Sequence, residues 1–112
     1  MSRNWTREQV LAALHLYTQL SFGQLHQRNP DIKALAERMG RTPSSVAMKL
    51  TNLASLDPQI TASGRKGLPG ASQLDREVWA ELQANWDAVA MDAAAACEAM
   101  LGTPKPQLED NS

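Results

Sequence analysis

Apolar residues recur at the spacing of an α-helix in four segments of the chain. The four segments run over residues 7–20, 30–39, 43–54 and 73–101. Each follows a residue that suits the N-cap position of a helix, and these residues are Thr6, Asn29, Thr42 and Ser72. The pattern therefore predicts an all-α fold in one compact helical domain.

The second and third predicted helices are separated by a very short turn. Gly40 stands where a left-handed residue ends a helix, and Pro43 suits the first position of the next one. Two helices joined so closely form a helix-turn-helix candidate. The last segment predicts a single long helix to about residue 101 that braces the others, with Trp79 and Trp86 in the core.

Two segments between the helices lack a helical period. Residues 22–28 are expected to form an exposed loop with at most one short helical turn, and residues 56–71 contain several Gly and Pro residues. A loop of more than about 12 residues inside a compact domain is frequently a binding loop. Polar residues and prolines after Leu101 indicate a flexible tail or linker over 102–112, which leaves 1–101 as the expected domain.

Charge is divided unevenly along the chain. Residues 1–74 contain nine basic and four acidic residues, a net charge of +5, whereas residues 75–112 contain two basic and eight acidic residues, a net charge of −6. The overall charge of −1 therefore conceals a basic region, which can attract a polyanion such as DNA.

Composition also limits the expected location of the protein. The most apolar stretch, 88–101, contains Asp92 and Glu98 and is shorter than the roughly 20 residues of a membrane span. No signal peptide is recognisable at the start of the chain. The single cysteine, Cys97, excludes an internal disulfide and a cysteine-based zinc site, and its setting suggests a buried residue. We expect a soluble, cytoplasmic protein without membrane contact.

Residues that could support catalysis are few. His15 and His26 are the only histidines, and neither a phosphate-binding glycine loop nor a His-Glu-x-x-His spacing is present. His15 is interpreted as a partly exposed helical residue. We therefore expect no enzymatic activity, no metal and no cofactor.

Side chains that suit DNA binding lie in the first three quarters of the chain. Loop donors and residues at the start of the third helix can contact phosphate together with free backbone N–H groups. The expected DNA-binding residues are His26, Gln27, Arg28, Arg41, Ser44, Ser45, Lys49, Arg65 and Lys66. For Ser44 and Ser45 the role of ordinary first-turn residues stands open beside DNA contact, and for Met48 a place in the core stands open beside one on the surface.

A set of different short motifs is distributed over about residues 4–90. They are Asn4-Trp5-Thr6-Arg7, Phe22-Gly23, Arg28-Asn29-Pro30, Gly40-Arg41-Thr42-Pro43, Met48-Lys49-Leu50, Asn52-Leu53-Ala54-Ser55-Leu56-Asp57-Pro58, Gly67-Leu68 and Trp79. As a set they resemble the N-terminal domain that precedes the HNH nuclease domain in modification-dependent restriction enzymes. The chain is also similar to the related sulfur-binding domains, which recognise phosphorothioate DNA, in which sulfur replaces a non-bridging backbone oxygen.

The resemblance implies a helical domain that contacts the DNA backbone with basic loops and encloses the sulfur in a shallow apolar cavity. A proline ring forms part of that cavity, and the matching residue here is Pro69. The implied sulfur-pocket residues are Leu68, Pro69, Gly70 and Ala71. The family's nuclease needs a separate His-Asn-His metal site, which nothing after Leu101 supplies. The implied partners are double-stranded DNA, phosphorothioate-modified, and an HNH nuclease in cis or in trans.

Two other functions stay open at this point. A plain helix-turn-helix protein would read base edges through Lys49, Thr51 and Asn52, and sulfur would then be irrelevant. A protein-interaction adaptor would use the acidic C-terminal helix and would not bind DNA.

Overall fold

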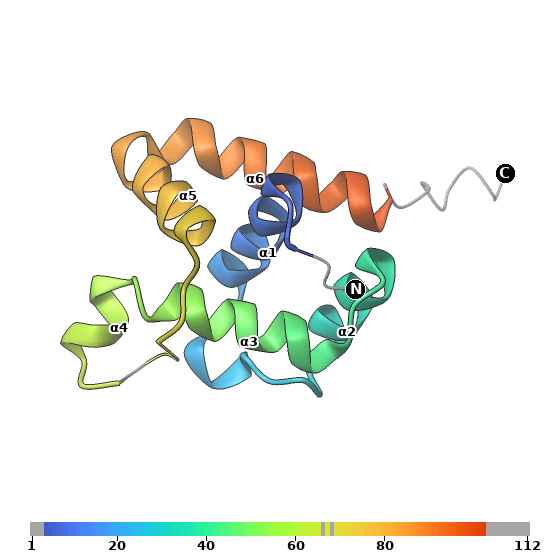
Figure 1. The fold of residues 1–112 in the computed structure, drawn as a ribbon, viewed down its shortest axis with the longest axis horizontal. Helices are drawn as coiled ribbons and strands as arrows, with labels where there is room; N and C mark the ends of the chain where they lie inside the picture. The colour runs from blue at the N-terminus through green and yellow to red at the C-terminus, as the bar shows by residue number, and fades with distance from the viewer. Residues whose placement is uncertain (1–3, 66, 68, 103–112) are drawn as a thin grey trace, which may run out of the picture.

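The computed structural model describes residues 4–65, 67 and 69–102. Within these residues the chain forms six α-helices, one short 3-10 helix and no strand (Figure 1). The elements are α1 (Arg7–Gln19), η1 (Phe22–Gln24), α2 (Pro30–Met39), α3 (Pro43–Ala54), α4 (Pro58–Ala62), α5 (Gln73–Ala84) and α6 (Trp86–Leu101). The all-α prediction is confirmed. The predicted tail beyond Gly102 and the predicted site residues Lys66 and Leu68 lie outside the described residues.

The four predicted helix starts are confirmed. They could be predicted because the hydrogen bonds that form an N-cap are local in sequence. The hydroxyl of Thr6 accepts a hydrogen bond from the backbone N–H of Gln9 at 3.1 Å, and the Gln9 side chain accepts one from the N–H of Thr6 at 3.2 Å. Side chains of three further residues accept from the first turn of the helix that follows them: Asn29, Thr42 and Ser72. These contacts satisfy N–H groups that have no partner within the helix.

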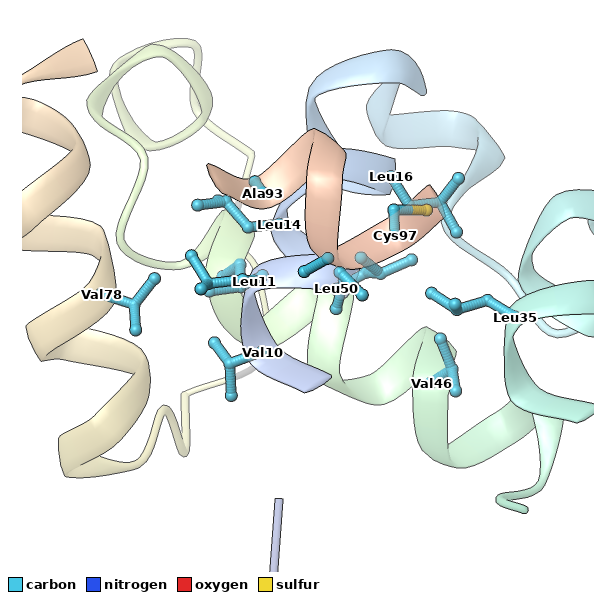
Figure 2. Packing of buried hydrophobic residues seen from close by; sticks show 14 of the residues in the cluster. Val10, Leu11, Leu14, Leu16, Leu35, Val46, Leu50, Val78, Ala93 and Cys97 are labelled. Carbon is cyan, nitrogen blue, oxygen red and sulfur yellow. The ribbon is translucent and has the colours of Figure 1, made fainter. Parts of the chain in front are cut away.

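Helix α1 lies at the centre of the molecule. Its most extensive contact is with α6, and it also contacts α2, α3 and α5. Figure 2 shows Val10 and Leu14 of α1 in one cluster with Leu50 of α3 and with Ala93 and Cys97 of α6. Because all five side chains are buried, this contact closes the core between the first and last helices and confirms the buried position of Cys97.

Helices α2 and α3 are joined by the short turn that the sequence predicts. Gly40 has φ of 70°, a left-handed conformation that suits glycine, and the backbone N–H of Arg41 donates to the carbonyl oxygen of Ala36 at 2.9 Å. Helix α3 begins after Thr42. In Figure 1, α3 runs across the molecule with α2 beside its N-terminal end.

The prediction of a single long C-terminal helix is wrong. Asn85 has φ of −149° and ψ of 77°, and it separates α5 from α6. Asparagine favours helix ends because its side chain competes for backbone hydrogen bonds. The bend allows α6 to return across α1, as Figure 1 shows. It also turns Trp86 away from the core, so the predicted burial of Trp86 is wrong: 53% of its surface is exposed.

The predicted irregular segment 56–71 contains the short helix α4. The carboxylate of Asp57 accepts the backbone N–H of Gln59 at 2.9 Å, and Pro58 takes the first helical position. The Tyr17 hydroxyl donates to the same carboxylate at 2.7 Å, which ties α4 to the end of α1. None of the helices in the described part of the chain combines the length and the apolar character needed to span a bilayer.

Candidate nucleic-acid interface

Three segments that are distant in sequence meet along one side of α3. They are residues 25–28, the exposed side chains of α3 and the described residues Arg65, Gly67, Pro69 and Gly70, and together we call them the α3 face. In Figure 1 the segment that follows α1 passes beside α3, and the chain between α4 and α5 approaches α3 near its C-terminal end. The expected DNA-binding residues of the described chain are distributed over these segments, apart from Arg41 and Lys49.

A hollow of about 250 Å³ lies on the α3 face, next to the N-terminal half of α3. Its lining residues are Leu25, Gln27, Ser44, Ala47, Met48 and Thr51. Leu25 and Ala47 are buried, whereas Met48 is 54% exposed. The surface of the hollow is largely apolar. The open question about Met48 is thereby answered in favour of the surface.

The loop over residues 25–28 holds three polar side chains outward beside this hollow. Its backbone is fixed by hydrogen bonds from the N–H of His26 to the Gln24 carbonyl at 2.9 Å and from the N–H of Arg28 to His26 Nδ1 at 3.2 Å. Because Nδ1 accepts, the neutral imidazole carries its proton on Nε2, which remains a donor. The side chains of His26, Gln27 and Arg28 are exposed, as their predicted role requires.

Between α4 and α5, Gly67 lies directly on the backbone of α3. A Cβ atom at Gly67 would overlap the Thr51 carbonyl oxygen and the Ser55 nitrogen, so only glycine permits this approach. The Arg65 guanidinium lies 5.7 Å from the centroid of the Phe22 ring. These contacts place Gly67 against α3 and the exposed Arg65 against Phe22 of η1.

The residues implied for the sulfur pocket have different environments. Pro69 is exposed, and Gly70 is exposed with φ of 134°. A Cβ at Gly70 would lie 3.7 Å from the side-chain oxygen of Asn52. Ala71 is buried. Pro69 follows Gly67, which lies against the Thr51 backbone, but Pro69 is not among the residues that line the hollow, so the structure does not bring the two together.

The prediction that Lys49 faces away from the core is wrong. Only 7% of Lys49 is exposed, and its ammonium lies 2.9 and 3.0 Å from the two carboxylate oxygens of Asp75, which is fully buried. The Trp5 ring covers the ammonium at 5.0 Å. Lys49 therefore belongs to a buried structural ion pair and is not exposed for contact with DNA. Asp75 is likewise buried and is not part of a solvated acidic surface.

Arg41 is engaged within the protein. Its guanidinium lies 4.4 Å from the centroid of the Trp5 ring, and its Nη2 donates to the Asn4 carbonyl oxygen at 3.1 Å and to Gln9 Oε1 at 2.9 Å. These contacts fix the segment before α1 against the start of α3. The primary role that the structure gives Arg41 is to hold this segment.

The two serines at the start of α3 differ in exposure. Ser44 is exposed and lines the hollow, whereas Ser45 is half-buried and its N–H already donates to the Thr42 hydroxyl at 3.1 Å. Ser44 is therefore the better placed of the two for an external contact.

Sequence reasoning missed the apolar lining of the hollow. Leu25 stands alone among polar residues between Gln24 and His26, which is an available signal for an apolar contact beneath a polar loop. Ala47 belongs to the inner stripe of α3, and its small side chain leaves the space that the hollow occupies.

Comparison with protein-family models, with curated proteins and with solved structures gives no match for this chain.

Proposed function

We propose that this chain is a DNA-binding module without a catalytic centre of its own, and that it recognises a phosphorothioate-modified backbone. One observation carries the proposal: the α3 face combines exposed basic side chains with an apolar hollow. Arg28 and Arg65 are exposed at this face, and Gln27 and Ser44 add hydrogen-bond donors at the hollow itself. Cationic donors suit phosphate, while the apolar surface suits sulfur.

The physical basis of selectivity is the cost of desolvation. Sulfur is larger and softer than oxygen and accepts weaker hydrogen bonds, so an apolar surface loses little by covering it. A phosphate oxygen covered by Leu25 or Met48 would lose hydrogen bonds to water without replacement. An unmade hydrogen bond of this kind costs about 1–3 kcal/mol, which corresponds to a preference of about tenfold to a hundredfold.

The structure favours backbone recognition over reading of base edges by α3. Of the three side chains suited to base reading, Lys49 is buried in its ion pair with Asp75. Leu25 and Gln27 also flank the exposed side of α3, so this helix does not project alone as a recognition helix in the major groove does. The resemblance to sulfur-binding domains agrees with this choice and suggests an HNH nuclease partner, in cis or in trans.

A first prediction concerns the modified duplex. Fluorescence anisotropy is measured with two matched duplexes, one with a single Rp phosphorothioate and one unmodified, at low and at physiological salt. We expect a preference of about tenfold or more for the sulfur duplex, retained as the salt concentration rises, because desolvation is insensitive to screening. Equal affinities that fall together with salt would exclude sulfur recognition, and no binding to either duplex would favour the adaptor function.

A second prediction concerns the basic side chains. Arg28→Ala and Arg65→Ala are each expected to weaken binding to both duplexes by about tenfold and to lower the slope of log K against log salt concentration by about 1, because each removes one phosphate contact. Arg76→Ala is the matched control, since Arg76 is an exposed arginine on α5 outside the α3 face. An unchanged slope in both variants, or an equal loss in the control, would overturn the assignment of the interface.

A further inference from the structure

A second and larger hollow, of about 540 Å³, lies where the end of α1, η1, α4 and α5 meet. Its volume falls within the range of about 300–1,000 Å³ that is typical of sites for small organic molecules. Four of the lining residues are aromatic: Tyr17, Phe22, Trp79 and Trp86. The chain has only five aromatic residues, so most of them gather at this hollow.

The aromatic walls combine fixed and accessible rings. Tyr17 and Trp79 contact each other edge to face, with ring centroids 5.9 Å apart, and Trp79 is only 7% exposed. Trp86 is 53% exposed at the start of α6, although a side chain of this size is usually covered. A rigid aromatic base with one exposed indole at its edge suits the stacking of a planar ring.

The polar groups of this hollow suit the edge of such a ring. The Asp57 carboxylate is held in place by the Tyr17 hydroxyl at 2.7 Å and by the backbone N–H of Gln59 at 2.9 Å, and each of its oxygens retains a further lone pair. Burial, followed by the bond to Asp57, raises the pKa of Tyr17, so its hydroxyl stays a donor to Asp57. Gln83 adds an amide, and the buried Nε1 of Trp79 has no acceptor among the described residues.

The charge beside one wall of the hollow indicates which ring-bearing ligand fits. Arg65 lies against the Phe22 ring, which is itself a wall of the hollow. The guanidinium suits an anionic group beside the Phe22 ring, whereas the Asp57 carboxylate in the hollow suits a hydrogen-bond donor on the planar ring itself. A nucleotide has this arrangement, with a base for the aromatic walls and a phosphate for the arginine.

We propose that this hollow binds a single unstacked nucleobase, with Trp86 and Phe22 contacting the face of the base, Asp57 accepting from an exocyclic amino group and Arg65 contacting the adjoining phosphate. That DNA supplies the base rests on the proposed function. Because Phe22 and Arg65 connect this hollow to the α3 face, a strand contacted at Arg65 could place one base here. Bases with an exocyclic amino group, adenine, cytosine and guanine, are preferred over thymine.

The test uses the full chain labelled with ¹⁵N and does not require a duplex. Nucleotide binding can therefore be detected even if the chain does not bind duplex DNA, and duplex binding can be detected even if nucleotides do not bind. The indole N–H signals of the three tryptophans are followed by NMR during titration with dAMP, dCMP, dGMP, TMP and 2-deoxyribose 5-phosphate. We expect the three amino-bearing nucleotides to shift the signals of Trp79 and Trp86, while Trp5, which lies against Arg41, stays unchanged. TMP binds about fivefold to tenfold more weakly, and the sugar phosphate leaves all three signals in place.

Variants separate stacking from general surface effects. Trp86→Ala is expected to weaken nucleotide binding by about tenfold, and Trp86→Phe to restore most of it, because a phenyl ring still stacks. Met91→Ala is the matched control, since Met91 is 73% exposed on α6 and lines neither hollow. Circular dichroism checks that each variant is folded. Equal affinity of parent and Trp86→Ala, equal shifts with the base-free sugar phosphate, or shifts of Trp79 and Trp86 caused by protein concentration alone would each overturn the proposal.

Discussion

An Asp75→Ala variant is expected to unfold with a free energy about 3–5 kcal/mol lower than the parent protein. The substitution leaves the Lys49 ammonium at 7% exposure without its carboxylate partner. It also removes the acceptor for the backbone N–H of Ser72, which the Asp75 side chain binds at 2.9 Å at the start of α5. The measurement is urea unfolding followed by circular dichroism at 222 nm.

Two further variants make this result specific to the ion pair. Glu77→Ala, an exposed substitution two residues away, is expected to change the free energy by less than about 0.5 kcal/mol. Lys49→Met combined with Asp75→Leu is expected to recover much of the loss, because replacing both charges by apolar groups leaves no uncompensated charge in the core. A loss in Asp75→Ala no larger than that of Glu77→Ala would show that the pair is solvated.

Gly67→Ala is expected to weaken binding to the phosphorothioate duplex by about tenfold or more, with only a modest loss of stability. The new methyl group would overlap the backbone of α3 at Thr51 and Ser55, and a helix backbone cannot yield as a flexible side chain can. The loop over residues 65–70 must therefore move outward, and Arg65 and Pro69 move with it. Anisotropy with the sulfur duplex measures the binding, and thermal unfolding measures the stability.

Gly23→Ala is the matched control for this substitution. A Cβ at Gly23 meets no atom within 4 Å, and its backbone is not left-handed. We expect this variant to bind and unfold like the parent. If Gly67→Ala also bound like the parent, the position of the loop against α3 would not matter for recognition.

The sequence was sufficient where structure is decided locally. Thr6, Asn29, Thr42 and Ser72 each predict a helix start correctly, because the hydrogen bonds involved span only two or three residues. Gly40 predicts a helix end for the same reason.

The errors concern contacts between segments that are far apart in sequence. Lys49 reads as a surface residue on its own helix, and only the position of Asp75, 26 residues later, explains its burial. Trp86 continues the apolar period of α5, but the bend at Asn85 turns it outward. Of the candidate site, the exposure of single residues such as Arg28 and Arg65 could be predicted, whereas the hollows could not, because their walls come from separate elements.

The ion pair between Lys49 and Asp75 also fixes the start of α5 to α3, at the end of the segment that connects the two helices. The chain leaves α3 at Ala54 and is fixed again to the middle of the same helix at Asp75, so the intervening segment is a loop with both ends anchored. Gly67 adds an attachment between these ends. The conformational entropy of ordering this loop is therefore lost largely during folding and not when a ligand binds. Under the proposed function, pre-organisation of this kind would let a small number of basic and apolar contacts support useful affinity, and it would couple that affinity to a buried pair of charges outside the α3 face.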